Sequence, residues 1–204
     1  MAVQRPARAG TLELVTTSVE GTEALGARLG GAARAAWPAP GPIVLLAGPL
    51  GAGKTAFVRG LARGLGLATP VKSPTFALHL RHAGAPGLEH LDLYRLRGGA
   101  DLDELGLSDL LAAPDLVAVE WPDRLGELKA LESALGARLI QLTLAPGTDD
   151  ERRITAQAAD PWLMALAGAV EGGAGPAADG PAADGQEVAP RHPGAERNHA
   201  RPGD

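Results

Sequence analysis

The 204-residue chain has no cysteine and only six aromatic residues. The absence of cysteine excludes disulfide bonds, thiolate nucleophiles and cysteine-ligated zinc or iron–sulfur sites. No apolar run approaches the roughly 18 residues that a membrane-spanning helix needs, and residues 1–10 lack the apolar segment of a secretory signal. We therefore expect a cytoplasmic protein that has no membrane partner.

Positive charge is also scarce. The chain carries 19 lysines and arginines against 24 acidic residues, which gives a formal net charge of −5. An acidic chain has no broad field that would hold RNA or polyphosphate by general attraction. We therefore expect any contact with RNA to depend on a partner protein, and any phosphate site to depend on a few well-placed groups.

Glycine and proline, in contrast, are abundant, with 28 glycines and 17 prolines. Residues 171–204 are rich in both, and apart from proline Val188 is the only apolar residue there that is larger than alanine. Such a segment cannot bury enough apolar surface to fold. We expect a flexible N-terminus over residues 1–10, one globular domain over 11–170 and a disordered tail over 171–204.

The pattern of apolar residues predicts the fold class. Ile43–Ala47 is a continuous apolar run, typical of a strand buried on both faces of a parallel sheet. Residues 76–80 and 88–94 flank a Gly/Pro segment and indicate an antiparallel hairpin at the sheet edge. Strands and helices otherwise alternate, which predicts a three-layer α/β sandwich of the P-loop NTPase type with a mostly parallel central sheet. The expected strands are 11–15, 43–47, 76–80, 88–94, 115–120, 139–144 and 153–158, and the expected helices are 24–37, 56–65, 101–112 (broken near 106) and 161–170.

A phosphate-binding motif follows the strand predicted at 43–47. Residues 48–55 read GPLGAGKT and match the Walker A pattern G-x-x-x-x-G-K-[ST] at every fixed position. Gly51 and Gly53 let successive backbone N–H groups turn toward phosphate oxygens, and the helix that follows adds the positive end of its dipole. Lys54 would place its charge against the β- and γ-phosphates, and the Thr55 hydroxyl would bind Mg²⁺. The motif therefore predicts a nucleoside triphosphate site.

Two acidic residues are candidates for the carboxylate that such a site needs on its metal side. Glu120 ends the apolar strand LVAVE, as a Walker B acid does, and Asp92 lies in the segment HLDLYR. Lys54 would stabilise the charge that develops during hydrolysis. Asp92 or Glu120 would position the attacking water, and the residues alone do not decide between them. The guanine-specific pattern [NT]-K-x-D is absent, so ATP is favoured over GTP.

Four segments together resemble one protein family. They are GPLGAGKTAFVRGLARGLG (48–66), VKSPTFAL (71–78), HLDLYRL (90–96) and VEWPDRL (119–125). In this order and spacing they resemble the TsaE family, small ATPases of bacterial tRNA threonylcarbamoyladenosine biosynthesis, over about residues 11–160. The resemblance implies a role in modifying adenosine 37 of tRNA. It also implies an ATPase that is weak alone and acts on a complex of two partner proteins, TsaB and TsaD, through which tRNA is reached indirectly.

The resemblance also assigns roles to individual residues. It implies that Thr55 and Glu120 bind Mg²⁺, that Asp92 and Trp121 are needed for activity, and that Thr75 lies near the γ-phosphate. The implied phosphate cradle comprises Gly51, Ala52, Gly53, Lys54, Thr55 and Ala56, and the residues implied near the adenine are Val19 and Thr22. Ala56 replaces a second threonine that the family usually has. This departure removes one hydroxyl hydrogen bond to phosphate but leaves Thr55 for the metal.

Two functions of other classes stay open beside the ATPase. A small-molecule P-loop kinase would close an arginine-bearing lid over the phosphates, and Arg95, Arg97 and residues 98–101 could form a short one. No obvious lid helix lies between the P-loop and Glu120, which speaks against a kinase. A nucleotide-sensing scaffold would depend on binding alone and would not need turnover.

The histidines at 79, 82 and 90 lie in or beside the predicted hairpin. Their spacing does not match a helical zinc site, so surface or packing roles are expected for them.

Overall fold

The computed structural model describes residues 9–36, 40–68, 71, 74, 77–96, 106–112, 114–126 and 133–168. The expected flexible N-terminus lies outside these ranges except for its last two residues, and the expected disordered tail lies outside them entirely. Thr75, Arg97 and the first half of the helix expected at 101–112 also lie outside the described residues.

A seven-stranded sheet in the order β1-β7-β6-β2-β5-β4-β3 forms the centre of the molecule. The middle strands β6, β2, β5 and β4 run parallel. At one edge β3 pairs antiparallel with β4, and at the other β7 and β1 extend the sheet in antiparallel fashion. The strands are β1 (Ala9–Thr16), β2 (Ile43–Ala47), β3 (His79–His82), β4 (Leu88–Asp92), β5 (Leu116–Glu120), β6 (Leu139–Pro146) and β7 (Arg152–Ala159). The predicted α/β fold and its edge hairpin are confirmed, and the antiparallel pair at the other edge is an addition.

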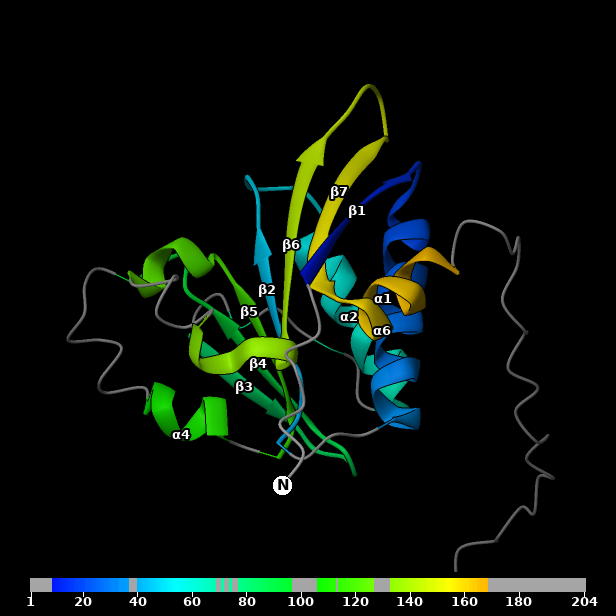
Figure 1. The fold of residues 1–204 in the computed structure, drawn as a ribbon. Coiled ribbons are helices and arrows are strands. Elements are labelled where there is room, and N and C mark those ends of the chain that lie inside the picture. Colours follow the sequence, from blue (N-terminus) through cyan, green and yellow to red (C-terminus); the bar gives the residue numbers. More distant parts are fainter. Residues whose placement is uncertain are drawn as a thin grey trace, which may run out of the picture.

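Helices lie on both faces of this sheet, so the molecule has three layers (Figure 1). Helices α1, α2 and α6 cover one face, and α4 lies on the other. Apolar side chains fill both interfaces, with Phe57 and Leu46 on the first face and Leu91 and Val119 on the second. The helices are α1 (Val19–Ala35), α2 (Lys54–Leu65), α4 (Leu107–Ala112), α6 (Asp160–Ala167) and the 3-10 helices η1 (Pro122–Leu125) and η2 (Gly136–Arg138).

Helix α1 begins earlier than the apolar pattern suggested. The pattern starts at Ala24, whereas the helix starts at Val19. Ser18 is the N-cap, and its side chain accepts a hydrogen bond from the backbone N–H of Gly21 at 3.0 Å. A serine cap satisfies one of the free N–H groups of the first turn, so the helix can begin within a polar stretch.

Helices α1 and α2 meet at backbone contact through four glycines. Gly26 and Gly30 of α1 face α2, and Gly60 and Gly64 of α2 face α1. A Cβ atom built on any of the four would overlap a backbone carbonyl oxygen of the other helix. Residues four apart lie on the same side of a helix, so each pair forms one smooth strip. This contact fixes α2, and with it the P-loop at its start, against α1.

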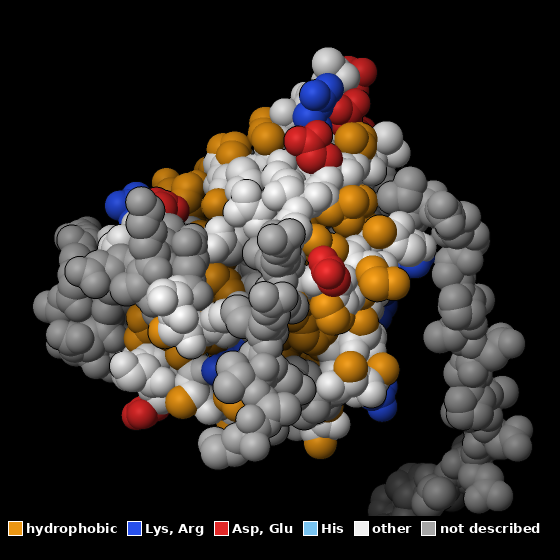
Figure 2. All heavy atoms as spheres, viewed as in Figure 1, with side chains coloured by type: hydrophobic (Ala, Val, Ile, Leu, Met, Phe, Trp, Pro, Cys, Tyr) orange, Lys and Arg blue, Asp and Glu red, His pale blue; other side chains and the backbone are white. Residues whose placement is uncertain are grey.

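The surface in the view of Figure 2 mixes apolar and polar areas, and charged side chains gather at the end of the β6–β7 hairpin. Asp149, Asp150 and Arg153 are exposed there. Within the described ranges, no helix combines the length and the apolar character that crossing a membrane requires.

Candidate nucleotide site

A cavity of about 360 Å³ lies at the carboxyl ends of the parallel strands β2, β4 and β5. Ligands of open α/β sheets bind at this edge, where the loops leave the strand ends. Its walls are formed by Val19, Leu50, Gly51, Ala52, Gly53, Lys54, Thr55, Ala56, Arg59, Asp92, Tyr94, Glu120, Trp121 and Arg152. Every site residue predicted from the sequence is among them except Thr22 and Thr75. Residues as far apart in the chain as Val19 and Arg152 therefore meet in one place, as a single site requires.

The P-loop has the backbone form that a phosphate cradle needs. Gly51 has a φ of 79° and Gly53 a φ of 99°, in the left-handed region that residues with a Cβ rarely adopt. Gly53 is the N-cap of α2 and offers no side-chain cap. The N–H groups of the first turn are therefore the donors that an anion at this end would take. Ala56 lines the cavity with a methyl group where a threonine would add a hydroxyl.

Lys54 is buried at the centre of the site, with 5% of its surface exposed. Its Nζ donates to the carbonyl oxygens of Gly48 at 2.7 Å and Pro49 at 2.8 Å, and lies 3.8 Å from the ring centre of Trp121. Burial lowers the pKa of Lys54, and nearby carboxylates, of which Glu120 is the strongest, partly oppose this. The ammonium is thus surrounded by carbonyl dipoles and an aromatic face, in a setting where an anionic phosphate would interact with it strongly.

The predicted metal ligands contact each other. Thr55 Oγ1 lies 2.9 Å from Oε1 and 3.1 Å from Oε2 of Glu120 and donates to this carboxylate. Asp92 lies directly opposite Glu120 in the parallel register of β4 and β5, and both carboxyl groups are buried. Carboxylate and hydroxyl oxygens are the donors that Mg²⁺ prefers, and it takes only one or two from the protein. The residues present therefore fit a magnesium ion.

An aromatic wall closes one side of the cavity. Trp121 follows β5 and has a φ of 61°, which is uncommon for a bulky residue, and Pro122 then starts η1. This turn brings its ring to 4.9 Å from the ring of Tyr94, measured between centroids. In this conformation the indole of Trp121 lies over the Lys54 ammonium.

Of the two residues expected near the adenine, one lines the cavity and the other is buried behind the P-loop. Val19 lines the cavity and is 38% exposed. Thr22 is fully buried, and its hydroxyl bonds Thr16 Oγ1 at 2.8 Å and donates to the Ser18 carbonyl at 3.1 Å. A Cβ on Gly53 would lie 3.5 Å from the Thr22 methyl. Thr22 therefore packs behind the P-loop, where it supports the loop without facing the cavity.

Arg152 is a wall residue that sequence reasoning missed. It is the first residue of β7, and its Cδ and Nε would lie 3.3 Å from a Cβ on Gly53. Its Nη1 donates to the Asp150 carbonyl at 2.6 Å, whereas Nε is buried and has no partner among the described residues. The chain around Arg152 has no motif that marks it. Only the sheet order, in which β7 lies two places from β2, brings it to the P-loop.

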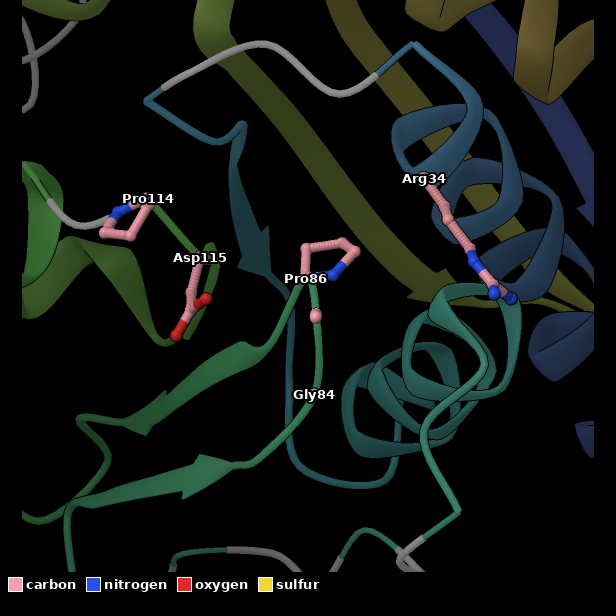
Figure 3. Close-up of a pocket in the computed structure, with 6 residues that line it drawn as sticks. Arg34, Gly84, Pro86, Pro114 and Asp115 are labelled. Atoms are coloured by element: carbon pink, nitrogen blue, oxygen red, sulfur yellow. The ribbon is translucent and has the colours of Figure 1, made fainter.

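A second cavity, of about 590 Å³, lies at the opposite end of the parallel strands. Figure 3 shows it between Arg34 of α1, Pro86 of the β3–β4 turn and Asp115 before β5. Both Asp115 oxygens are engaged, Oδ2 by Arg81 at 2.8 and 3.0 Å and Oδ1 by the N–H of Gly87 at 3.0 Å. Asp115 thus ties the β3–β4 hairpin to β5. Among the described residues that line the cavity, no set of reactive groups converges.

Replacement of Asp115 by alanine is expected to lower the free energy of unfolding by about 1–3 kcal/mol, because the buried N–H of Gly87 loses its acceptor. Arg81→Ala is the matched control. Arg81 is half exposed and pairs with Glu89 as well as Asp115, so its replacement removes only ion pairs that water screens, keeps the Gly87 hydrogen bond and is expected to cost less. Urea unfolding of both variants measures the difference, and nucleotide affinity should not change in either. Equal losses for the two variants would contradict the assigned role of the Gly87 hydrogen bond.

These features define a P-loop nucleotide-binding protein of the ATPase type. They are the α/β sheet, the glycine-rich P-loop, the buried lysine and the contact between threonine and carboxylate. Within that class, the family model described as threonylcarbamoyl adenosine biosynthesis protein TsaE matches residues 16–154. The chain belongs to the TsaE family, whose role is in tRNA threonylcarbamoyladenosine modification.

Individual relatives agree with this assignment. The tRNA threonylcarbamoyladenosine biosynthesis protein TsaE of Mycobacterium leprae is 41% identical over 126 residues, which cover 57% of this chain and 75% of that protein. The protein of the same name from Bacillus subtilis is 36% identical over 122 residues, covering 59% and 72%. The crystal structure of YdiB from Bacillus subtilis superimposes with a TM-score of 0.58 at 29% identity and covers 80% of this chain and 96% of that one. The predicted family is therefore confirmed.

Proposed function

We propose that the 360 Å³ cavity binds ATP together with Mg²⁺ and that the chain hydrolyses this ATP slowly by itself. The observation that carries the proposal is that Lys54, Thr55, Glu120 and Asp92 converge on one cavity. The N–H groups of the P-loop and the Lys54 ammonium would hold the phosphates. Val19 and Arg152 line the same cavity, and Val19 would lie near the adenine.

Thr55 and Glu120 are the residues that would hold Mg²⁺, because their oxygens already meet at about 3 Å. When bound, the ion would neutralise charge on the phosphate oxygens. The buried position of Lys54 adds to this effect, since a charge acts more strongly on phosphate where water is excluded. The chain's own part in the reaction is therefore to place a fixed positive charge and to orient the groups around it.

We propose that Asp92 is the residue that positions the attacking water. Both oxygens of Glu120 are close to Thr55, and Oε1 also contacts His90 at 2.9 Å. These contacts give Glu120 a fixed metal-side role. Asp92 ends the neighbouring strand at the same level and lines the same cavity. A carboxylate at this place can accept a proton from water as the water attacks the γ-phosphate.

Two isosteric variants separate these roles. Asp92→Asn is expected to keep Mg²⁺·ATP affinity and to lose turnover by roughly 100-fold or more, the usual contribution of a general base. Glu120→Gln is expected to lose both turnover and the effect of Mg²⁺ on nucleotide affinity. Calorimetry with and without Mg²⁺, together with phosphate release, measures each quantity. If Asp92→Asn hydrolysed ATP normally, the water would have to be assigned to another group.

The biological reaction that this ATPase would serve is the threonylcarbamoyl modification of adenosine 37 in tRNA, in the cytoplasm. We propose that it acts on a complex of TsaB- and TsaD-like proteins, which would supply the tRNA contact. The chain's net charge of −5 supports this arrangement, because it gives the chain no general attraction for RNA.

The test compares ATP consumption and phosphate release for the chain alone, with the two partners, and with partners and tRNA. Slow release that rises when the partners are added is the expected result. Consumption of ATP that exceeds the phosphate released would point to a kinase. Tight binding without turnover in any mixture would point to a nucleotide-sensing scaffold.

A further inference from the structure

Glu120 is held by a histidine as well as by the P-loop threonine. Nε2 of His90 lies 2.9 Å from Oε1 of Glu120, and the His90 side chain is fully buried. Thr55 contacts the same carboxylate from α2. The carboxylate is therefore fixed from two sides, one within the sheet and one at the start of the P-loop helix.

The strand register explains how His90 reaches this carboxylate. His90 lies opposite Ala118, and Asp92 lies opposite Glu120. His90 and Asp92 are two residues apart in β4, so their side chains share one face of the sheet. Ala118 is buried and small, which leaves room for the imidazole to extend diagonally toward Glu120. A larger residue at 118 would occupy this space.

The contacts of the ring also indicate which nitrogen carries the hydrogen. Nδ1 of His90 is buried and has no hydrogen-bond partner among the described residues. An ionised carboxylate can only accept a hydrogen bond, so the ring nitrogen that faces Glu120 has to carry a hydrogen. Nε2 of His90 is therefore the donor to Glu120. The neighbouring ring of His82 lies 6.1 Å away between centroids. Burial lowers the pKa of His82, and Glu89 partly opposes this.

We propose that His90 is a positioning residue for the magnesium site. It donates Nε2–H to Oε1 of Glu120 and holds the carboxylate toward Thr55, so that Oε2, whose one printed contact is the Thr55 hydroxyl at 3.1 Å, faces the place where the cation would bind. This inference rests on the proposed Mg²⁺–nucleotide function of the same cavity. Hydrogen bonds of this kind orient ligating carboxylates in metal sites, and their loss typically lowers metal affinity by about 10–100-fold.

Three variants of the full chain test the proposal. His90→Leu removes the donor, and His90→Gln keeps an N–H donor at a similar reach. His82→Leu is the matched control, because it removes a neighbouring buried imidazole that has no contact with Glu120. The measurements are the affinity for Mg²⁺ in the presence of ADP, with Mn²⁺ as a paramagnetic substitute, and the affinity for ADP in the presence of EDTA.

We expect His90→Leu to lower the affinity for Mg²⁺ by about 10–100-fold and to leave metal-free ADP binding unchanged. His90→Gln should recover most of the loss, and His82→Leu should show none. Unchanged Mg²⁺ affinity in His90→Leu, equal loss in His82→Leu, or no recovery in His90→Gln would each overturn the proposal. A wild-type chain that bound no Mg²⁺·ADP would instead overturn the proposed function, and this inference with it.

The wild-type chain supplies a further test that does not depend on the folding of any variant. Two-bond ¹H–¹⁵N correlation spectra distinguish a protonated from an unprotonated ring nitrogen. We expect His90 to show a protonated Nε2. An unprotonated Nε2 would overturn the proposal, because that nitrogen could not then donate to Glu120.

Discussion

Replacement of Lys54 by alanine is expected to abolish nucleotide binding. The ammonium is the only lysine group in the cavity wall and the only full positive charge within the P-loop itself, whereas the other two cations of the wall, Arg59 and Arg152, come from α2 and β7. A hydrogen bond to a charged group contributes about 1.5–3 kcal/mol, so loss of two such bonds to phosphate weakens binding by roughly 100-fold or more. Calorimetric titration with Mg²⁺·ATP measures the loss.

Arg63→Ala is the matched control for this variant. Arg63 lies on the same helix α2, is exposed and does not line the cavity. It pairs with Glu23 at 3.4 Å, and Glu23 keeps its second pair, with Arg59 at 3.3 Å, when Arg63 is replaced. Its replacement removes one positive charge from α2 without changing the site, so affinity should stay at the wild-type value. If Lys54→Ala bound Mg²⁺·ATP as the Arg63 variant does, the phosphate site would have been placed wrongly.

The crossing of α1 and α2 leads to the largest expected effect on stability. Gly30→Ala would drive a methyl group into the backbone carbonyl of Leu61. Overpacking of this kind costs about 1–3 kcal/mol or more, and here backbone on both helices has to move. The gain in helix propensity is only about 1 kcal/mol. We expect a net loss of about 2 kcal/mol or more, which lowers Tm by roughly 4–8 °C in a domain of this size.

Gly31→Ala makes the same substitution one residue further along α1, at a position that is not in close contact with α2. A Cβ at Gly31 would meet only the Gly64 carbonyl oxygen, at 4.0 Å, which is ordinary contact. The propensity gain then has no opposing cost, so Gly31→Ala is expected to raise the free energy of unfolding by up to about 1 kcal/mol. Thermal unfolding of the two variants side by side gives shifts of opposite sign. Shifts of the same sign would show that the helices can separate at little cost.

Local patterns predicted much of this fold. The apolar run Ile43–Ala47 is the strand β2 to the residue, because burial on both faces leaves a continuous signal. The start of α1 was placed too late, since its cap at Ser18 lies in a polar stretch that carries no apolar period. The antiparallel edge formed by β7 and β1 was not foreseen either. These strands are more than 100 residues apart, and no turn between them marks the pairing.

The site residues also fall into those that the sequence predicted and those that it did not. Lys54 and Thr55 follow from a contiguous motif, and Glu120 from its place at a strand end. His90 was expected to have only a surface or packing role, and its contact with Glu120 depends on the register of β4 against β5. The glycine pairs of α1 and α2 are visible in the sequence, but their spacing alone does not say that the two strips face each other. Groups that meet only through pairing of distant segments were thus the ones that the sequence did not reveal.

The position of Trp121 means that its fluorescence would report on nucleotide binding. Its ring centre lies 3.8 Å from the Lys54 ammonium, so the field of that charge acts directly on the indole. Trp162, by contrast, packs in α6 and donates to the Ala137 carbonyl at 3.0 Å, away from the cavity. A phosphate that draws the ammonium toward itself changes the field at one indole and not at the other. In a chain with phenylalanine at 37 and 162, the emission of Trp121 would therefore register the arrival of nucleotide without any added label.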